Sequence, residues 1–497
     1  MISAVDKAGG ISYATYDGIG NLTSMTGPGG NMKEYVYDST GRILQKGRIY
    51  ADNKDGYYYN AAGLLQTTVA TNFYYKTYAY DLAGRITKYE DTEYTYDANG
   101  NVIAAKNETG TVKREYDELN RVVKYTDIYG RVIRYEYDCC GNLRKMTHST
   151  GEVAVYTYDE NHNMLSSGVE GEDCTTTYEY NKQNQITKVN NIDGGSVTKS
   201  YDRAGRLQIL TDKDKNGKIL FVNIYTYDVL GRITSELNPI DMTDYRMTYD
   251  SLGRLTQRAE YDLRTNEVLH TETFTYDAAG NIVSAVQPDG TENTYQYDEG
   301  NSVGKMNNDE IEVTAKGNTI FCMINGKKAN LTYDTRNRLK KINGDNNEYW
   351  YDPDNNRINM YYYQTNMQYL YDSFGGRNRV IWTSDHNENE TSYFYGAEGL
   401  LWSRCNGEYQ VYHYDYRGSV VAVTDIDGNV TDTLKYDAYG SVVERTGNSA
   451  LIFTYNGQYG VLTDPTGLLY MRARYYNPDL KRFMNADIID PAFCWVY

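Results

Sequence analysis

The sequence predicts an all-β protein in which one long antiparallel sheet curls on itself, with few or no helices. Tyrosine occurs 55 times among 497 residues and supplies most of the aromatic side chains, so it must carry much of the packing. A tyrosine-containing element recurs with a period near 21 residues. In addition, no stretch longer than about ten residues keeps apolar side chains at helical spacing without an intervening Gly or Asn.

The recurring element reads Tyr-x-Tyr-Asp-x-x-Gly, then Arg or Asn, then an aliphatic residue. Clear copies start at Tyr78, Tyr94, Tyr225 and Tyr295, and degenerate copies fill the gaps between them. The side chains that define the element in three of these copies are Tyr80, Asp81, Gly84, Arg85, Tyr96, Asp97, Gly100, Tyr227, Asp228, Gly231 and Arg232. Spacing this regular indicates a repeat architecture and argues against a set of unrelated domains.

The chemistry of the element predicts a strand, a tight turn and a returning strand. The two tyrosines lie on one face of a strand because side chains alternate. The Asp carboxylate then accepts hydrogen bonds from backbone N–H groups, and the Gly or Asn takes a left-handed conformation. Arg or Asn and the aliphatic residue begin the next strand. About 24 such units, or roughly 40 to 50 strands, are too many for one sandwich, and a ribbon that twists at every strand pair must curl.

Composition excludes several classes of function. The chain carries 50 basic and 67 acidic residues, a net charge of −17, so most of its surface would repel a nucleic-acid backbone. We expect no membrane span, because no window approaches 18 consecutive apolar residues. The segment from Met1 to Lys7 has neither the basic nor the apolar region of a signal peptide and opens inside the repeat pattern. It suggests a piece of a longer polypeptide or a short paralogue.

The cysteines and histidines nominate no metal or catalytic centre. Six cysteines occur without Cys-x-x-Cys spacing, which favours free thiols: Cys139, Cys140, Cys174, Cys322, Cys405 and Cys494. If Cys139 and Cys140 lie on a strand, they face opposite sides and cannot chelate one ion together. The five histidines are isolated from one another, and neither a Walker loop nor a Gly-x-Ser-x-Gly element occurs. We expect no cofactor.

A weak calcium motif is the exception. Asp212, Asp214 and Asn216 match the start of a calcium loop. The twelfth position is Asn223, where an EF-hand needs a bidentate Glu, and no helices are predicted to flank it. An ordinary turn between strands is therefore the favoured interpretation.

These repeats resemble the YD repeats of the Rhs family, which includes bacterial polymorphic toxins, cell-wall-associated proteins, insecticidal toxin-complex components and animal teneurins. The C-terminal stretch resembles the Rhs-associated core at Asp464, Pro465, Gly467, Leu468, Arg472, Arg474, Tyr475, Tyr476, Pro478, Arg482 and Phe483. The resemblance implies a hollow shell, solenoid-like or cocoon-like, formed by residues 1–390, with degenerate repeats at about 301–390. Residues 391–497 would then form the core, truncated at its C-terminal end.

Function follows from the resemblance. It implies a structural, encapsulating segment of a secreted or cell-surface protein, which encloses or presents a C-terminal effector that this chain does not contain. The implied partners are that effector or an upstream portion of the shell. An open strand edge would also favour self-association.

Two alternatives remain open. In the first, the tyrosine repeats form an adhesin that binds carbohydrate, although aromatic glycan-binding repeats lean on tryptophan and this chain has only four. In the second, the core is an aspartyl self-cleaving element. Asp487 matches the family's Arg-Phe-x-x-x-Asp position, but the second aspartate region and the cleavage point are missing. We therefore do not expect this chain to be an enzyme.

Overall fold

A computed structural model describes residues 1–30, 32–48, 54–70, 74–298, 301–314, 317–373 and 378–485. Within these ranges the chain forms 48 strands, and its only helical elements are the short 3-10 turns η1 (Gly344–Asn346) and η3 (Gly457–Tyr459). This confirms the predicted fold class and the expected number of strands. No helix in the described ranges is long and apolar enough to cross a membrane.

The strands form three sheets, and within each sheet strands that follow one another in sequence pair antiparallel. The first sheet, which we call the outer wall, has thirty strands. They are β1 (Ile2–Val5), β2 (Ile11–Tyr16), β3 (Leu22–Thr26), β4 (Met32–Tyr37), β5 (Ile43–Arg48), β6 (Lys54–Tyr59), β7 (Leu65–Ala70), β8 (Tyr74–Tyr80), β9 (Ile86–Tyr89), β10 (Thr92–Tyr96), β11 (Val102–Asn107), β12 (Gly110–Tyr116), β13 (Val122–Thr126), β14 (Val132–Tyr137), β15 (Leu143–His148), β16 (Val153–Tyr158), β17 (Met164–Val169), β18 (Thr175–Tyr180), β19 (Ile186–Asn190), β20 (Ser196–Tyr201), β21 (Leu207–Lys213), β22 (Ile219–Tyr227), β23 (Ile233–Asn238), β24 (Thr243–Tyr249), β25 (Leu255–Asp262), β26 (Val268–Tyr276), β27 (Ile282–Val286), β28 (Glu292–Tyr297), β29 (Val303–Met306) and β30 (Asp309–Glu310).

The second sheet, the inner sheet, has fourteen strands, and the third, the plug sheet, has four. The inner sheet contains β31 (Glu312–Val313), β32 (Thr319–Ile324), β33 (Lys327–Tyr333), β34 (Leu339–Ile342), β35 (Asn347–Tyr351), β36 (Arg357–Tyr362), β37 (Thr365–Asp372), β38 (Arg379–Ser384), β39 (Glu390–Tyr395), β40 (Leu400–Cys405), β41 (Glu408–Tyr414), β42 (Val420–Thr424), β43 (Val430–Tyr436) and β44 (Val442–Thr446). The plug sheet contains β45 (Leu462–Thr463), β46 (Leu469–Met471), β47 (Arg474–Asn477) and β48 (Arg482–Phe483).

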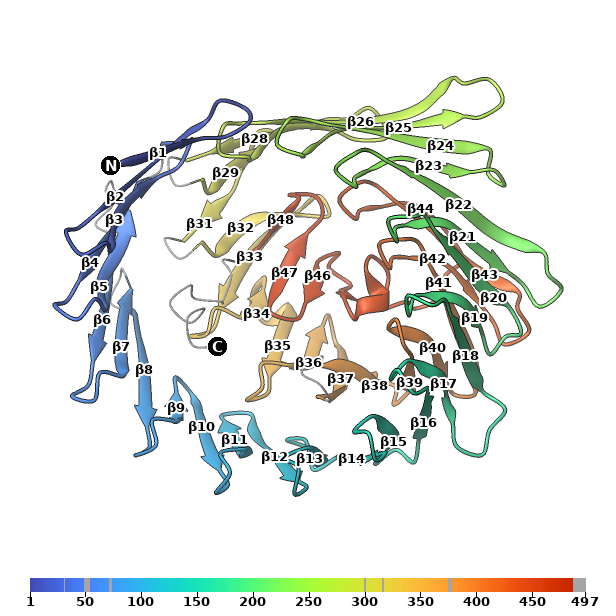
Figure 1. The fold of residues 1–497 in the computed structure, drawn as a ribbon, viewed down its shortest axis with the longest axis horizontal. Coiled ribbons are helices and arrows are strands. Elements are labelled where there is room, and N and C mark those ends of the chain that lie inside the picture. The colour runs from blue at the N-terminus through green and yellow to red at the C-terminus, as the bar shows by residue number, and fades with distance from the viewer. Residues whose placement is uncertain are drawn as a thin grey trace.

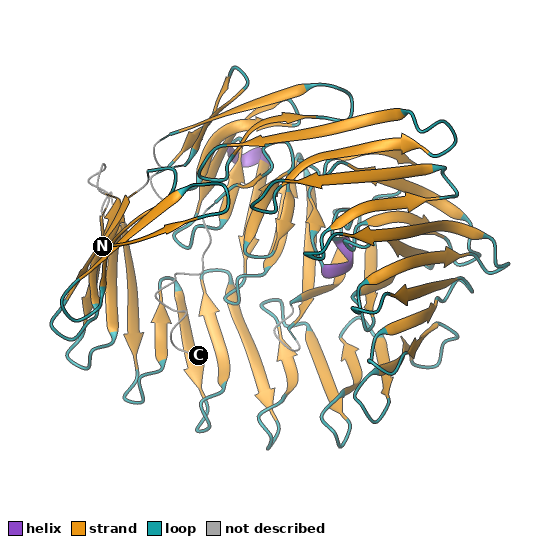
Figure 2. Cartoon of the chain, turned by 45° about the horizontal axis from the view of Figure 1, so that its top comes forward, coloured by secondary structure: helices purple, strands orange, loops and turns teal. Residues whose placement is uncertain are grey.

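The outer wall curls into a ring, and the inner and plug sheets lie within it (Figure 1). Figure 2 shows the wall as a row of hairpins that turns continuously. Hydrogen bonds join wall and inner sheet at widely separated places, including Arg131 to the Tyr369 carbonyl and the Ala438 N–H to Glu272. The shell is thus partly filled by the chain's own later strands.

Each repeat unit of the wall contains one tight turn of the same kind. In β22 the pairing register shifts by one residue between Thr226 and Tyr227, so each unit ends its strand with a bulge. The Asp228 N–H then donates to the Arg232 carbonyl (2.9 Å), and the Gly231 N–H donates to the Asp228 carbonyl (3.0 Å). Gly231 has φ +84°, where a side chain would be strained. Asn120 takes the equivalent position with φ +61°.

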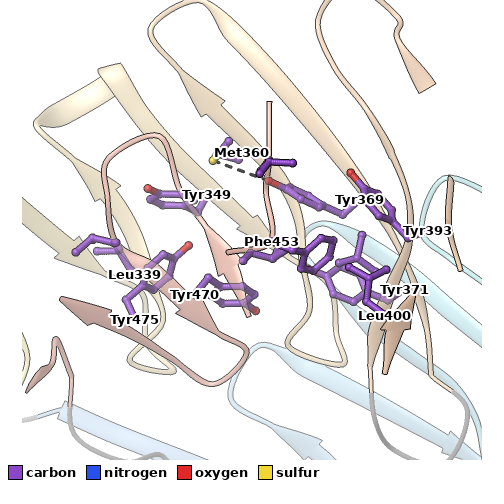
Figure 3. Close-up of a cluster of buried hydrophobic side chains, with 14 of the residues drawn as sticks. Leu339, Tyr349, Met360, Tyr369, Tyr371, Tyr393, Leu400, Phe453, Tyr470 and Tyr475 are labelled. Carbon is purple, nitrogen blue, oxygen red and sulfur yellow. Dashed lines mark hydrogen bonds between the residues drawn. The ribbon is translucent and has the colours of Figure 1, made fainter. Parts of the chain in front are cut away.

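Burial differs between the wall and the inner sheet. In β14, Ile133 and Tyr135 are buried while Arg134 and Glu136 are exposed, the alternation of a sheet with one wet face. In β38 the four residues from Val380 to Thr383 are all buried, so both faces of this strand are covered. The main hydrophobic core therefore centres on the inner sheet (Figure 3). Its largest members include many tyrosines, as the composition predicts.

The inner sheet begins with β31 and runs without interruption through β39, which spans residue 390. The predicted division of the chain at residue 390 rests on sequence motifs and stays a prediction.

Candidate functional site

The turn of most described units is held by an Asp carboxylate, and Asn60 and Asn181 take its place in two of them. In the unit around Asp228, the Oδ1 atom accepts the backbone N–H groups of Leu230 (2.9 Å) and Arg232 (3.0 Å). The Oδ2 atom accepts Nε–H of the Arg232 side chain (2.6 Å). The backbone hydrogen bond from Arg232, with the arginine charge, lowers the pKa of Asp228. The arginine of the repeat therefore closes its own turn, a role that the sequence analysis missed.

The same arginine also binds the next unit. The Arg232 guanidinium lies over the Tyr249 ring, 4.5 Å from its centroid, and Nη1 donates to the Asp250 carbonyl (3.4 Å). The Tyr249 hydroxyl in turn donates to the Ile233 carbonyl (2.7 Å). The Arg–Tyr contact recurs in Arg42–Tyr59, Arg85–Tyr96, Arg121–Tyr137, Arg206–Tyr227, Arg254–Tyr276, Arg338–Tyr351 and Arg379–Tyr395. Asp, Arg and Tyr thus form a clasp that recurs along one edge of the sheets and is interrupted where Asn replaces the arginine, as at Asn101, Asn142 and Asn163.

This use of the rings bears on the adhesin hypothesis. The closing tyrosine of each of these units has one face under a guanidinium and its hydroxyl on a carbonyl, as for Tyr96 on Ile86 (2.6 Å). The face of the ring that lies under the guanidinium cannot stack on a sugar. Carbohydrate binding through the repeats stays a prediction, and the ring arrangement does not favour it.

Removing one clasp hydroxyl should have a measurable but small effect. Tyr249→Phe leaves the Ile233 carbonyl without its donor and should lower the free energy of unfolding by about 1 kcal/mol. Urea unfolding followed by far-UV circular dichroism measures this. Tyr58→Phe is the matched control, because Tyr58 is 59% exposed. Equal losses in both variants would mean that the clasp hydroxyl does not contribute.

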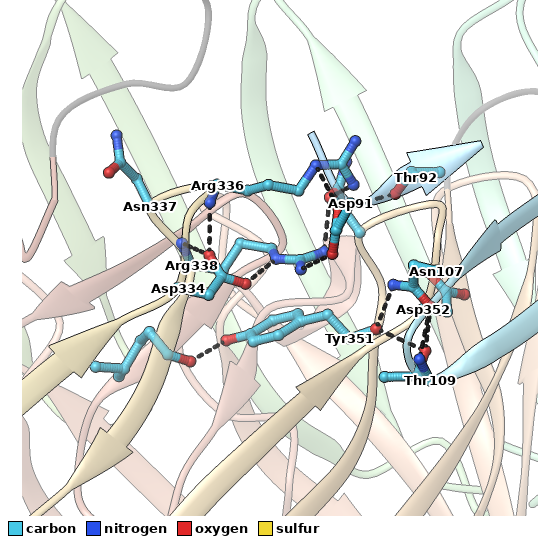
Figure 4. A network of polar contacts seen from close by, with 12 residues as sticks. Asp91, Thr92, Asn107, Thr109, Asp334, Arg336, Asn337, Arg338, Tyr351 and Asp352 are labelled. Carbon is cyan, nitrogen blue, oxygen red and sulfur yellow. Dashed lines mark hydrogen bonds and ion pairs between the residues drawn. The ribbon is translucent and has the colours of Figure 1, made fainter. Parts of the chain in front are cut away.

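Polar side chains lock the wall to the inner sheet. Asp91 of the wall lies between Arg336 and Arg338, whose nitrogens are 3.6 and 3.7 Å from its two oxygens (Figure 4). Beside it, the Asn107 side chain and the Thr109 hydroxyl donate to the Tyr351 carbonyl at 3.2 and 3.0 Å. These contacts join residues more than 240 positions apart. They hold the first strands of the inner sheet against β10 to β12.

A second lock is built around His413, which is fully buried on β41. Its Nδ1 atom lies 2.6 Å from Asp212 Oδ2 on β21, and its Nε2 atom lies 3.0 Å from the Thr424 hydroxyl. That hydroxyl donates its only proton to Asp193 Oδ2 (2.7 Å), so Nε2 must itself be the donor to Thr424. The hydrogen bonds therefore describe a charged imidazolium between two carboxylates. Burial lowers its pKa, but Asp212 and Asp193 raise it more, and the net shift is upward.

The residues of the calcium motif bind different partners and do not converge on one site. Asp212 points to His413, whereas Asp214 Oδ1 accepts the backbone N–H groups of Asn216 and Lys218 (both 2.9 Å), as in any other turn of the wall. Among the described residues no group of three or more His, Cys, Asp or Glu side chains could hold a metal ion. The structure gives the calcium hypothesis no support.

The core motif contributes a buried ion pair at the centre of the molecule. Asp464 Oδ1 lies 2.6 Å from Arg357 Nη1, and each side chain is only 1% exposed. The same nitrogen donates to the Tyr475 hydroxyl (2.8 Å), and Nη2 donates to the Tyr369 hydroxyl (3.2 Å). The guanidinium is also 4.6 Å from the centroid of the Tyr470 ring. Burial raises the pKa of Asp464, while Arg357 lowers it. This pair fastens the plug sheet to β36.

The remaining core-motif residues shape the plug. Gly467 has φ +88°, and a side chain there would collide with Asn325. Leu468, after Pro465, is fully buried, and Arg472 Nη2 donates to the Tyr459 carbonyl (2.6 Å). None of these groups faces a reactive partner.

The end of the plug is held by contacts within the plug, to the inner sheet and to the wall. Arg474 lies over the ring of Phe483 (3.6 Å), and the Tyr476 hydroxyl donates to the Tyr439 carbonyl (3.0 Å). After Pro478, Arg482 donates to Asn281 and to the Asn301 carbonyl, both at 3.3 Å. Asp487, the candidate for self-cleavage, lies outside the described residues, as does Cys494.

A thirty-stranded sheet that curls around later strands of its own chain, with a Tyr–Asp–Arg clasp at successive turns, defines a YD-repeat shell. The family model of the teneurin YD-shell matches residues 129–263 and 193–492, and that of the RHS repeat matches residues 16–55 and 96–132. The chain belongs to the teneurin YD-shell family, which confirms the Rhs/YD-repeat resemblance.

This chain is similar to known proteins in sequence and in fold. The tRNA nuclease WapA of Bacillus subtilis is 28% identical over 414 residues, which cover 76% of this chain and 14% of that protein. The double-stranded DNA deaminase toxin A of Burkholderia cenocepacia is 23% identical, covering 98% of this chain and 39% of that protein. The crystal structure of TcdB2-TccC3-TEV superposes with a TM-score of 0.79 at 17% identity, over 97% of this chain and 29% of that one. The chain thus spans a minor part of the relatives it matches.

Proposed function

We propose that this chain is a structural segment of a secreted or cell-surface shell that encloses a C-terminal effector polypeptide. The observation that carries the proposal is the position of the last described residues. Met484 donates its N–H to the Tyr475 carbonyl, and its own carbonyl accepts the Thr319 N–H (2.7 Å) and the Tyr333 hydroxyl (3.1 Å). The chain at this point is held by inner strands, and Figure 1 draws β48 within the ring. A polypeptide that continues from here starts on the inside.

Two further features support an enclosing role. Buried titratable groups such as His413 and Arg357 hold sheets together, and nothing in these two clusters nominates catalysis on a separate substrate. In addition, relatives whose printed names describe nucleases or a deaminase are much longer than this chain, which matches only a part of them. The activities in those names belong, in this proposal, to segments outside the shared region.

The upstream partner belongs to the same proposal. Within the described part of the chain, β1 pairs only with β2, and its side chains are exposed, with Ile2 at 63% and Val5 at 66%. An unpaired edge offers backbone N–H and C=O groups to another strand. We infer that a further stretch of shell, or a second copy of the chain, adds to the sheet at this edge.

Protease protection tests the enclosing role. An unstructured reporter peptide is appended after residue 497 in one protein and before residue 1 in a second, and both are treated with protease under native conditions. We expect the C-terminal reporter to be cleaved at least tenfold more slowly than the N-terminal one, because Met1 is 87% exposed and the described C-terminal residues lie inside. Equal cleavage rates would contradict the proposal.

A further inference from the structure

The turn between β14 and β15 carries two adjacent cysteines on the surface. Cys139 and Cys140 occupy the two middle positions between Asp138 and Gly141, the positions written x-x in the repeat. Both are exposed, and their sulfur atoms are 3.9 Å apart. The prediction from a strand, that the two side chains face opposite sides, is therefore wrong, because the pair lies in a turn.

The turn fixes the backbone that carries the two thiols. Asp138 Oδ1 accepts the N–H groups of Cys140 (2.9 Å) and Asn142 (2.8 Å), and Oδ2 accepts the Asn142 side-chain amide (2.8 Å). Gly141 takes φ +89° to complete the turn. The two sulfurs are thus presented together by a closed clasp, and little conformational entropy is lost when a ligand bridges them.

The distance between the sulfurs suits a single bridging atom. Two thiolates bound to one centre with bonds of about 2.3 Å stand about 3.5 to 3.8 Å apart for bond angles between about 100° and 109°, close to the 3.9 Å observed. The hydrogen bond with Cys139 raises the pKa of Cys140, because the proton of one thiol lies between the two sulfur atoms. A bridging centre would replace the protons of both thiols.

We propose that Cys139 and Cys140 form a dithiol site for a thiophilic centre that takes two thiolates, of which a monosubstituted trivalent arsenical is the class that fits best. The pair does not provide a site for a metal ion that requires three or four protein ligands, because no third His, Cys, Asp or Glu completes such a group among the described residues. An organoarsenic(III) dihydroxide needs only two. Each thiol transfers its proton to one departing hydroxide, so two arsenic–sulfur bonds form, two arsenic–oxygen bonds break and two waters leave, without any change in oxidation state.

The other described cysteines make the site specific. Cys174 and Cys322 are buried, and Cys405 is half-buried, so the paired thiols are the fully exposed ones in the described part of the chain. Burial also raises the pKa of the Cys322 thiol to about 12, which keeps it protonated and unreactive.

Phenylarsine oxide tests the proposal on the full chain. After reduction with a phosphine and its removal, we expect one adduct per chain by intact mass, loss of maleimide labelling at Cys139 and Cys140, and reversal by a small dithiol but not by a monothiol. Cys139→Ser and Cys140→Ser should each weaken binding by about 100-fold or more, because chelation is lost. Cys405→Ser is the matched control and should bind as the native chain does.

Two results would overturn it. One is a Cys139→Ser/Cys140→Ser protein that still binds one equivalent with unchanged affinity. The other is a native chain in which both thiols react with maleimide but no arsenical adduct forms. Far-UV spectra and melting temperatures of all variants show that the fold is intact, since both substitutions lie in an exposed turn.

Discussion

Replacing Arg357 with Met is expected to destabilise the protein by about 3–5 kcal/mol, because it leaves the Asp464 carboxylate buried without its partner. Both side chains are 1% exposed, and the guanidinium also donates to two tyrosine hydroxyls, Tyr475 and Tyr369. At 1% exposure the Asp464 carboxylate has almost no contact with bulk solvent. Urea unfolding followed by tyrosine fluorescence and far-UV circular dichroism measures the loss.

Two variants make this test specific. Arg357→Met/Asp464→Leu removes both charges and should recover most of the loss, since a buried pair is often replaceable by apolar side chains. Arg144→Met removes an arginine that pairs with Glu136 on the surface and should cost less than about 1 kcal/mol. If the single variant at Arg357 were no worse than the surface variant, the ion pair would not be what holds the plug sheet.

Replacing His413 with Ala is expected to cost a similar amount, about 3–5 kcal/mol, because Asp212 and Asp193 would then be buried together without a positive charge. His270→Ala is the control, since His270 is exposed and bonds only a carbonyl. Probes placed in each sheet would report the loss in free energy of unfolding separately for the inner sheet and for the wall. A loss below 1 kcal/mol would mean that the imidazole is not charged in the folded protein.

The pH dependence of the His413 lock has a definite sign. The folded pKa of His413 lies above its unfolded value of about 6.5. Its contribution is therefore complete below pH 6.5 and is lost as the pH rises through the folded pKa. The difference in stability between the native chain and His413→Ala should shrink as the pH rises from 6 toward 9. A difference that grows over this range would contradict the charged lock.

The wall could be predicted from the sequence because its physics is local. Tyr, Asp and Gly determine the bulge, the turn and the left-handed residue within about eight positions. The period then predicts that this unit recurs along the sheet. The Arg–Tyr contact between units could also have been predicted from the sequence. Arg232 and Tyr249 belong to successive copies of one pattern, so a stack wherever a copy carries Arg could have been predicted from the period.

The closure of the shell could not be predicted in this way. Arg357 and Asp464 are 107 residues apart, and His413 and Asp212 are 201 apart. No local pattern pairs them, because each is set by how far the ribbon has curled when the later strands arrive. The cysteine pair is a different case. The repeat already places Cys139 and Cys140 in the turn, and the error came from treating them apart from the pattern.

Hydrogen exchange of backbone amides tests most directly the central claim that the wall encloses the inner and plug sheets. The account predicts that amides in the consecutively buried stretches of β38 to β42, among them Val380–Thr383 and Ser392–Tyr395, exchange only through global unfolding. It also predicts that Arg357→Met lowers their exchange free energy by the same amount as the global stability. Exchange of these strands by local opening, at a rate that neither denaturant nor Arg357→Met alters, would show that the wall does not enclose them.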